Sequence, residues 1–167
     1  MKNVLTIASH IATVLALTLW LGGMLTLGAV VAPIVFSIVP APTNADAMTI
    51  VFRRFDAIAI TSAAVVLFCE LWRVKITHEL SRLDIARGVS VAVAGVLALY
   101  EGMVVSPRVE ALHRGGAIRG VGDLGMQLES AHALAESISK LEAFALVAFV
   151  VLYVTTLVSS ARPGISD

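Results

Sequence analysis

The chain has 167 residues, of which 58% are hydrophobic and 14% charged, with 12 basic and 12 acidic residues in balance. A soluble domain has about 45–50% apolar and about 25% charged residues, so this composition indicates a membrane protein. Zero net charge gives no basic field that would attract nucleic acid, and a single cysteine excludes an internal disulfide or a CxxC metal site.

The first predicted span lies in a stretch from Asn3 to Ala45 that contains no Asp, Glu, Lys or Arg. A bilayer needs about 20 apolar residues in a helix, and a charge at its centre costs about 2.5–3.5 kcal/mol. The stretch is longer than the apolar part of a signal peptide, about 7–15 residues, so we interpret residues 4–32 as a retained span. We expect a bend at its glycines or at Pro33.

Three further apolar stretches predict spans at about residues 57–76, 86–106 and 143–161. Residues 43–56 and 124–142 mix apolar and charged side chains, which favours short amphipathic helices at the interface. The sequence therefore predicts an all-α fold. It is a single integral membrane domain, a bundle of four transmembrane helices with short interfacial amphipathic helices and both termini on one side.

The orientation depends on the short connection between the second and third predicted spans. It carries Arg73, Lys75, Arg82 and Arg87 at or near the span ends, and positive residues there favour the cytoplasmic side. Over the whole chain the basic residues on the two sides tie, so this connection decides. We predict a protein of the bacterial inner membrane with both termini in the cytoplasm.

Small residues recur at every fourth position on two of the spans. In lipid, such stripes let helix backbones approach closely. We therefore predict two packing seams, or one seam and one surface for a partner subunit: Ala8, Ala12 and Ala16 on the first span, and Ser90, Ala94, Ala98 and Gly102 on the third.

Charged residues inside spans are the first candidates for function. His10 and Glu70 come from antiparallel spans at similar depth, and Arg73 shares a helix face with Glu70. We predict that these three form an intramembrane polar cluster. It could serve a proton, a metal or haem b, or it could be a structural ion pair with a histidine bonded to a neighbouring helix.

A second candidate cluster comprises Glu101, His132 and Glu142 on the side opposite the termini. Two carboxylates and a histidine could bind a divalent metal. Alternatively, Glu142 could simply complement the dipole at the N-terminus of the fourth span. The chain has no P-loop, GxSxG, HExxH or dinucleotide motif, so we expect no catalytic site.

The segments Trp20-Leu-Gly-Gly-Met24 and Ala32-Pro-Ile-Val-Phe36, followed by Phe52–Phe55, resemble the bacterial domain-of-unknown-function family related to transmembrane protein 205. This resemblance implies a four-helix membrane protein without a settled activity. In the family's last motif, H-x-x-S, His132 is kept and the serine is replaced, and Ser139 stands where asparagine is expected.

A second likeness is to the first spans of copper-resistance membrane proteins and of the haem-binding protoporphyrinogen oxidase family. Both place a histidine upstream of a Trp-and-glycine motif, as His10 precedes Trp20 here. The oxidase family looks to need a lysine in its third span, and the third predicted span of this chain has none.

From these patterns we expect an accessory or structural subunit of a larger membrane assembly, in contact with lipids and other membrane proteins. Two alternatives stay open. One is a haem- or metal-binding redox protein that uses His10, and the other is a small-solute or metal transporter built around Glu70 and Glu101.

Overall fold

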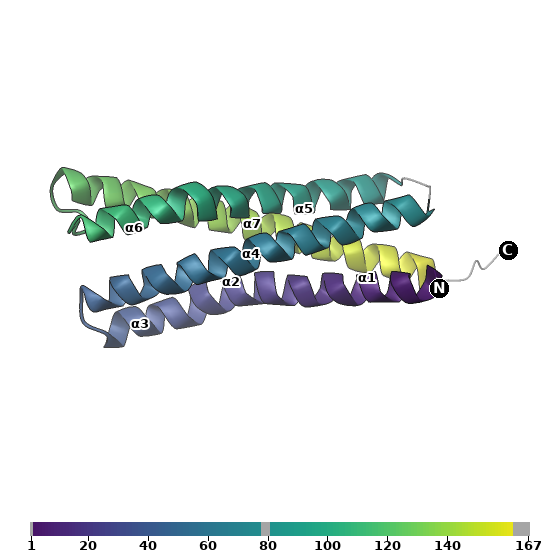
Figure 1. Ribbon diagram of the computed structural model, residues 1–167, viewed down its shortest axis with the longest axis horizontal. Coiled ribbons are helices and arrows are strands. Elements are labelled where there is room, and N and C mark those ends of the chain that lie inside the picture. Colours follow the sequence, from purple (N-terminus) through teal and green to yellow (C-terminus); the bar gives the residue numbers. More distant parts are fainter. Residues whose placement is uncertain (1, 78–80, 162–167) are drawn as a thin grey trace.

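The computed structural model describes residues 2–77 and 81–161, which form four long antiparallel helical stretches (Figure 1). No strand occurs in these residues. All four stretches are long and apolar enough to cross a membrane: Val4–Ile38, Thr43–Ile76, Arg82–Arg114 and Gly122–Ser159. The predicted fold class, an all-α bundle of four membrane-spanning helices, is therefore confirmed.

The first and third stretches are interrupted by π-helical turns. The first consists of α1 (Lys2–Leu17), η1 (Thr18–Gly22), α2 (Gly23–Thr26), η2 (Leu27–Val31) and α3 (Ala32–Ile38). The third consists of α5 (Arg82–Tyr100), η3 (Glu101–Val105) and α6 (Ser106–Arg114). The second and fourth are single helices, α4 (Thr43–Thr77) and α7 (Gly122–Ala161).

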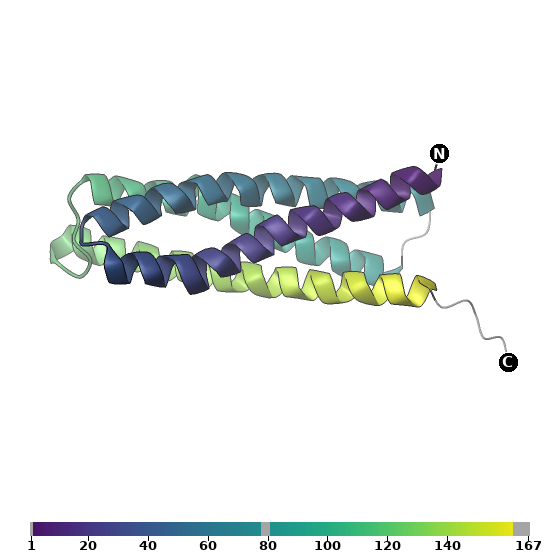
Figure 2. The ribbon, with the colours of Figure 1, turned by 90° about the horizontal axis from the view of Figure 1, so that it is seen from below.

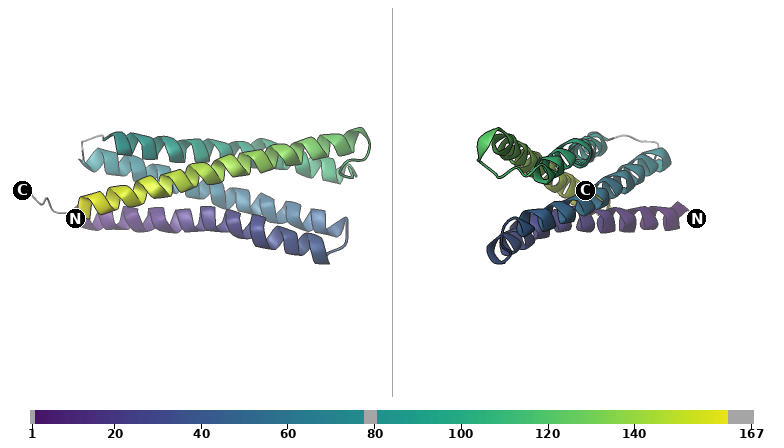
Figure 3. Two further views of the ribbon diagram at one scale, coloured as in Figure 1. Left: turned by 180° about the vertical axis from the view of Figure 1, so that it is seen from behind. Right: turned by 60° about the vertical axis from the view of Figure 1, so that its left-hand side comes forward.

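Both ends of the described chain lie at one end of the bundle, as four spans require (Figure 2). Helix α5 packs against α4 and α7, and α1 packs against α4. Toward the opposite end, the hairpin of α3 and α4 leans away from the hairpin of α6 and α7 (Figure 3). The two hairpins are therefore farther apart at this end than in the middle of the bundle.

Prolines explain two of the three π turns. The N–H of Ala32 bonds the carbonyl of Leu27, and that of Ser106 bonds the carbonyl of Glu101. Each donor directly precedes a proline, at 33 and 107, and proline cannot donate a backbone hydrogen bond. The wider turn lets the helix continue past the proline. The third helical stretch therefore continues to Arg114, beyond the predicted limit at residue 106.

The amphipathic stretches expected at the interface are continuous with the spanning helices. Residues 43–56 are the first part of the 35-residue α4, and residues 124–142 are the first half of the 40-residue α7. No proline or glycine separates either stretch from its span, so nothing breaks the helix. At about 1.5 Å per residue, α7 is about 60 Å long and extends well beyond the bilayer core.

The core combines large side chains with a stripe of small ones. Trp20, Phe149 and Leu146 are fully buried, and Ala94 and Ala98 of the third span belong to the same core. Ala94, Ala98 and Gly102 are buried and Ser90 half-buried. On the first span the stripe is turned partly outward, since Ala16 is buried, Ala12 half-buried and Ala8 exposed. The buried face there runs instead through Ser9, Thr13, Ala16 and Trp20.

Two adjacent glycines offer a matched test of close packing. A Cβ on Gly23 would lie 2.5 Å from the ring of Phe55 in α4, whereas a Cβ on Gly22 would meet nothing within 4 Å. Gly22→Ala should be neutral or should raise the free energy of unfolding by up to about 1 kcal/mol through helix propensity. Gly23→Ala should lower it by about 1–3 kcal/mol through overpacking.

The measurement is thermal or denaturant unfolding of both variants in the same detergent. Equal stabilities would contradict the prediction and would mean that the Phe55 ring moves aside freely.

Candidate functional site

Two arginines on the third helical stretch mark the levels at which the two surfaces of the bilayer core are expected. From Arg87 to Arg108 the helix rises about 30 Å, which matches the hydrocarbon thickness of a typical bilayer. Two polar clusters lie between these levels. One is close to Arg87 and the termini, and the other lies about 10 Å inside the level of Arg108.

The first cluster, here called the terminal ionic cluster, consists of Glu70, Arg73 and Arg87. The carboxylate of Glu70 bridges both arginines. Its Oε1 accepts from Nη2 of Arg73, and its Oε2 accepts from Nε of Arg87 at 2.6 Å. Glu70 is 4% exposed and Arg87 is 3% exposed. Because burial of an unpaired charge is costly, these contacts tie α4 firmly to α5.

Further partners hold Arg87 to the ends of two helices. Its Nη2 donates to Asp84 at 2.9 Å, and its Nη1 donates to the hydroxyl of Thr156 in α7 at 3.1 Å. Asp84 also caps α5, since Ser81 and Asp84 exchange side-chain and backbone hydrogen bonds at the helix start. The cap and the ion pair therefore support each other.

His10 joins this cluster through Tyr153 and Arg73. Its Nδ1 lies 2.7 Å from the hydroxyl of Tyr153 and 3.4 Å from Nη1 of Arg73. The guanidinium of Arg73 also lies 4.9 Å from the centre of the Tyr153 ring. The structure thus brings His10, Glu70 and Arg73 together, with Arg73 standing between the histidine and the carboxylate.

The contacts of His10 assign its tautomer. A guanidinium can only donate, so Nδ1 accepts and the proton of the neutral ring lies on Nε2. A histidine that ligates a metal shows the opposite pattern, because its other nitrogen donates to a carboxylate or carbonyl. The surroundings of His10, with two arginines and a tyrosine hydroxyl, therefore do not fit ligation of haem or metal by this residue.

The second cluster, here called the carboxyl cluster, consists of Asp56, Glu101 and Glu142, from three different helical stretches. Glu142 is 2% exposed and accepts a hydrogen bond of 2.6 Å from the indole Nε1 of Trp20. Glu101 accepts from the hydroxyl of Ser139, at 3.1 Å and 3.2 Å to its two oxygens. All three carboxyl groups lie close enough to repel one another.

Arg53 is the cation beside this cluster, and other groups share it. Its Nη1 lies 3.8 Å from Oδ2 of Asp56, and its Nε lies 3.4 Å from Glu110. Nη1 also donates to the carbonyl of Gly102 at 2.7 Å. Pro107 cannot donate to this carbonyl, because proline has no backbone N–H. Among the described side chains, Oδ2 of Asp56 is buried without a hydrogen-bond partner.

The carboxyl cluster therefore differs in charge from the terminal ionic cluster. Near the termini, Glu70 and Asp84 balance Arg73 and Arg87. In the carboxyl cluster, Arg53 pairs with Asp56 and with Glu110 outside the cluster, whereas Glu101 and Glu142 accept from a serine hydroxyl and an indole N–H. Since lipid offers no water to compensate the excess, such a group can hold protons inside the membrane.

The structure does not bring His132 to the two glutamates predicted beside it. His132 lies about 15 Å from Glu142 along α7, and its ring packs against that of His113 at 5.7 Å. Glu142 is in the middle of α7, so complementation of a helix N-terminus does not explain it. In the described part of the chain, no three His, Cys, Asp or Glu side chains are placed to hold one metal ion.

Sequence reasoning missed Arg87, Tyr153 and Asp56 as members of these clusters. Arg87 and Asp56 lie near the expected ends of spans, where charged residues are ordinary, and Tyr153 carries no charge that would single it out in the sequence. The available signal was the antiparallel register. If His10 and Glu70 share a depth, then residues near the start of the third span and the end of the fourth share it too.

The family model described as Domain of unknown function (DUF4149) matches residues 15–117, which is more than half of the chain. The chain belongs to the DUF4149 family. The matched range contains Asp56, Glu101 and the whole terminal ionic cluster, whereas His10 and helix α7, with Glu142 and Tyr153, lie outside it. No match was found among curated proteins or among solved structures.

The terminal ionic cluster gives a direct stability prediction for this DUF4149 protein. Glu70→Gln removes the charge that compensates two buried arginines, so it should lower the free energy of unfolding by about 3–5 kcal/mol. The control is Glu136→Gln, which breaks an exposed pair with Lys140 and should leave the stability nearly unchanged, because solvent screens such a pair. Thermal unfolding in detergent measures both, and equal melting temperatures would show that the buried pair is not stabilising.

Proposed function

We propose that the protein takes up and releases protons within the bilayer through the carboxyl cluster, as part of proton-linked transport of a small solute. The observation that carries this proposal is the convergence of three carboxyl groups, Asp56, Glu101 and Glu142, with Arg53 beside Asp56. Ionisable residues inside membrane helices are characteristic of proton relays in pumps and transporters.

The local helix geometry supports the same conclusion. Trp20, which donates to Glu142, lies in the π turn η1, and Glu101 is the first residue of η3. Such turns often occur at functional sites. Two of the residues that meet in the cluster are thus presented by interrupted helices, which can change their hydrogen bonding more readily than a regular helix.

The chemistry of the cluster favours a proton as the bound species. Three carboxylates close together in a low dielectric cannot all stay ionised beside one arginine, so they share protons as a coupled group. Glu70, which the sequence suggested as a transport residue, is held by two arginines. Glu101 therefore keeps this role in the proposal, with Asp56 and Glu142 as its neighbours.

Infrared spectroscopy of the protein in lipid tests proton binding directly. At neutral pH the wild type should show the carbonyl absorption of protonated carboxylic acids, and it should shift in D₂O. Glu142→Gln should reduce this band, whereas Glu136→Gln, on the exposed surface, should leave it unchanged. Absence of the band in the wild type would overturn the proposal.

Reconstituted vesicles test the transport step. With a pH-sensitive dye inside and a potassium diffusion potential, vesicles that contain the wild type should take up protons faster than empty vesicles. Glu142→Gln should abolish the difference if it folds with normal thermal stability. Uptake that is equal with and without protein would limit the cluster to a structural role.

A role as accessory or structural subunit of a larger inner-membrane assembly is the second candidate function. It is favoured by the terminal ionic cluster, which uses its charges to join α1, α4, α5 and α7. We propose for this role that both termini face the cytoplasm. We also propose that the protein is related to transmembrane protein 205, as the Trp20–Met24 segment suggests. A partner that co-purifies in stoichiometric amount in mild detergent would support this role.

One spectrum tests the remaining alternative, a haem-binding protein that uses His10. Because Nδ1 of His10 accepts from Tyr153 and Arg73, we expect no Soret band from the purified protein and no spectral change in His10→Ala. A Soret band that His10→Ala abolishes would contradict the assigned tautomer and would restore haem ligation.

A further inference from the structure

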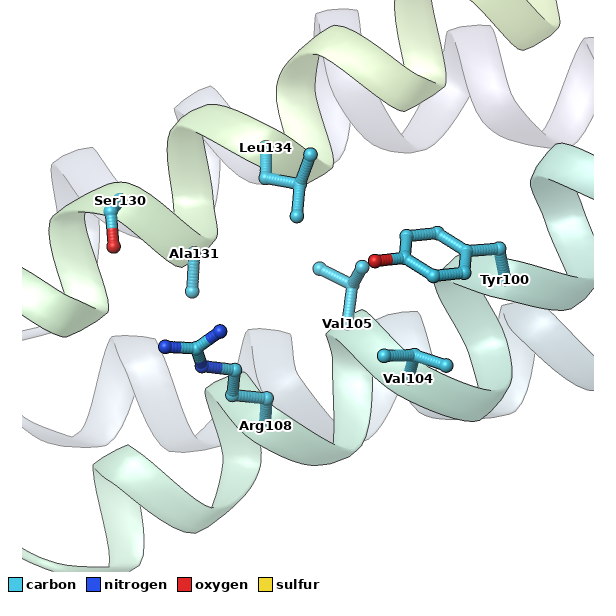
Figure 4. Close-up of a pocket in the computed structure, with 7 residues that line it drawn as sticks. All are labelled: Tyr100, Val104, Val105, Arg108, Ser130, Ala131 and Leu134. Atoms are coloured by element: carbon cyan, nitrogen blue, oxygen red, sulfur yellow. The ribbon is translucent and has the colours of Figure 1, made fainter.

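A cavity of about 210 Å³ lies between α7 and the stretch formed by η3 and α6, at the end of the bundle opposite the termini (Figure 4). Val104, Val105, Ala131 and Leu134 form its apolar wall, and the polar groups that line it are Tyr100, Arg108 and Ser130. It is separate from both polar clusters described above.

Arg108 is the only charged side chain that lines this cavity. Within the described residues it has no hydrogen bond and no ion pair, and the hydroxyl of Tyr100 also lacks a partner. Three other arginines at this end are paired, Arg53 with Asp56 and Glu110, Arg114 with Glu110, and Arg119 with Glu129. The cavity thus offers an uncompensated cation and a free hydroxyl.

The surroundings of the cavity match the chemistry of a lipid. Arg108 lies at the level where the bilayer surface is expected, about 30 Å from Arg87 along the helix. Tyr100, Val104 and Leu134 are exposed and lie on the side of the cavity that faces the bilayer core. The volume is below that of pockets that enclose a drug-sized ligand, so it suits a headgroup whose chains remain outside.

We propose that this cavity binds the phosphate group of an anionic phospholipid. Arg108 supplies the counter-charge, and the hydroxyl of Tyr100 donates a further hydrogen bond. The first part of an acyl chain lies along Val104 and Leu134. Basic pockets between membrane helices bind lipid headgroups in this way, and a guanidinium suits phosphate because it donates in a planar fork.

Arg54 provides a matched control for the charge. It is an exposed arginine in the same half of the bundle, also without a hydrogen bond or ion pair within the described residues, and it does not line this cavity. Arg108→Gln and Arg54→Gln therefore remove the same charge near the same membrane surface. Only the first removes it from a cavity.

The experiment measures binding of phosphatidylglycerol by native mass spectrometry of the full chain, released from micelles that contain phosphatidylglycerol and phosphatidylcholine. Arg108→Gln should weaken retention of phosphatidylglycerol at least about tenfold, the loss expected for one charge-assisted hydrogen bond. Arg54→Gln should change it little. Ser130→Phe, which fills the cavity and keeps the charge, should also reduce retention.

Equal losses in Arg108→Gln and Arg54→Gln would overturn the proposal, because surface charge alone would then explain binding. Competition with inorganic phosphate separates two sources of the same chemistry. Retention that persists in excess phosphate supports a lipid site, whereas displacement by phosphate alone would overturn it in favour of a site for a soluble anion. Equal melting temperatures of the variants in neutral lipid serve as the check on folding.

Discussion

Inside a bilayer a charged side chain has to find its counter-charge within the protein, because the hydrocarbon offers no water to replace it. In this protein Glu70 satisfies two arginines at once, one on its own helix and one on the next. Arg87 then reaches Thr156, and Arg73 reaches His10. All four spans meet in one network, and their relative depth is fixed by it.

The opposite half of the bundle follows a different rule. Its three carboxyl groups outnumber the nearby cations, and one buried oxygen of Asp56 accepts no hydrogen bond within the described residues. In the proposed function, this group takes up protons. The charge-balanced cluster and the cluster with excess carboxyl groups are thus separated along the long axis of the bundle.

Prolines interrupt the backbone hydrogen bonds of two spans, and one of these interruptions lies beside the carboxyl cluster. A π turn ends immediately before Pro33 and another before Pro107, and Arg53 donates to the carbonyl of Gly102 that the second proline leaves without its usual partner. The same arginine lies beside Asp56. The interrupted turn thus holds a carbonyl that binds Arg53 and begins at Glu101, which accepts from Ser139.

The sequence by itself determined that the chain spans a membrane four times, because charge-free stretches of this length are compatible only with lipid. It also identified His10, Glu70 and Arg73 as neighbours, since residues at equal depth on antiparallel spans can be found by counting. The tertiary structure alone decided that Arg87, Tyr153 and Asp56 join the clusters and that His132 does not. In a membrane bundle the lipid-facing and core-facing sides of a helix are equally apolar, so the sequence pattern does not show which face is turned inward, and that rotation decides which side chains meet.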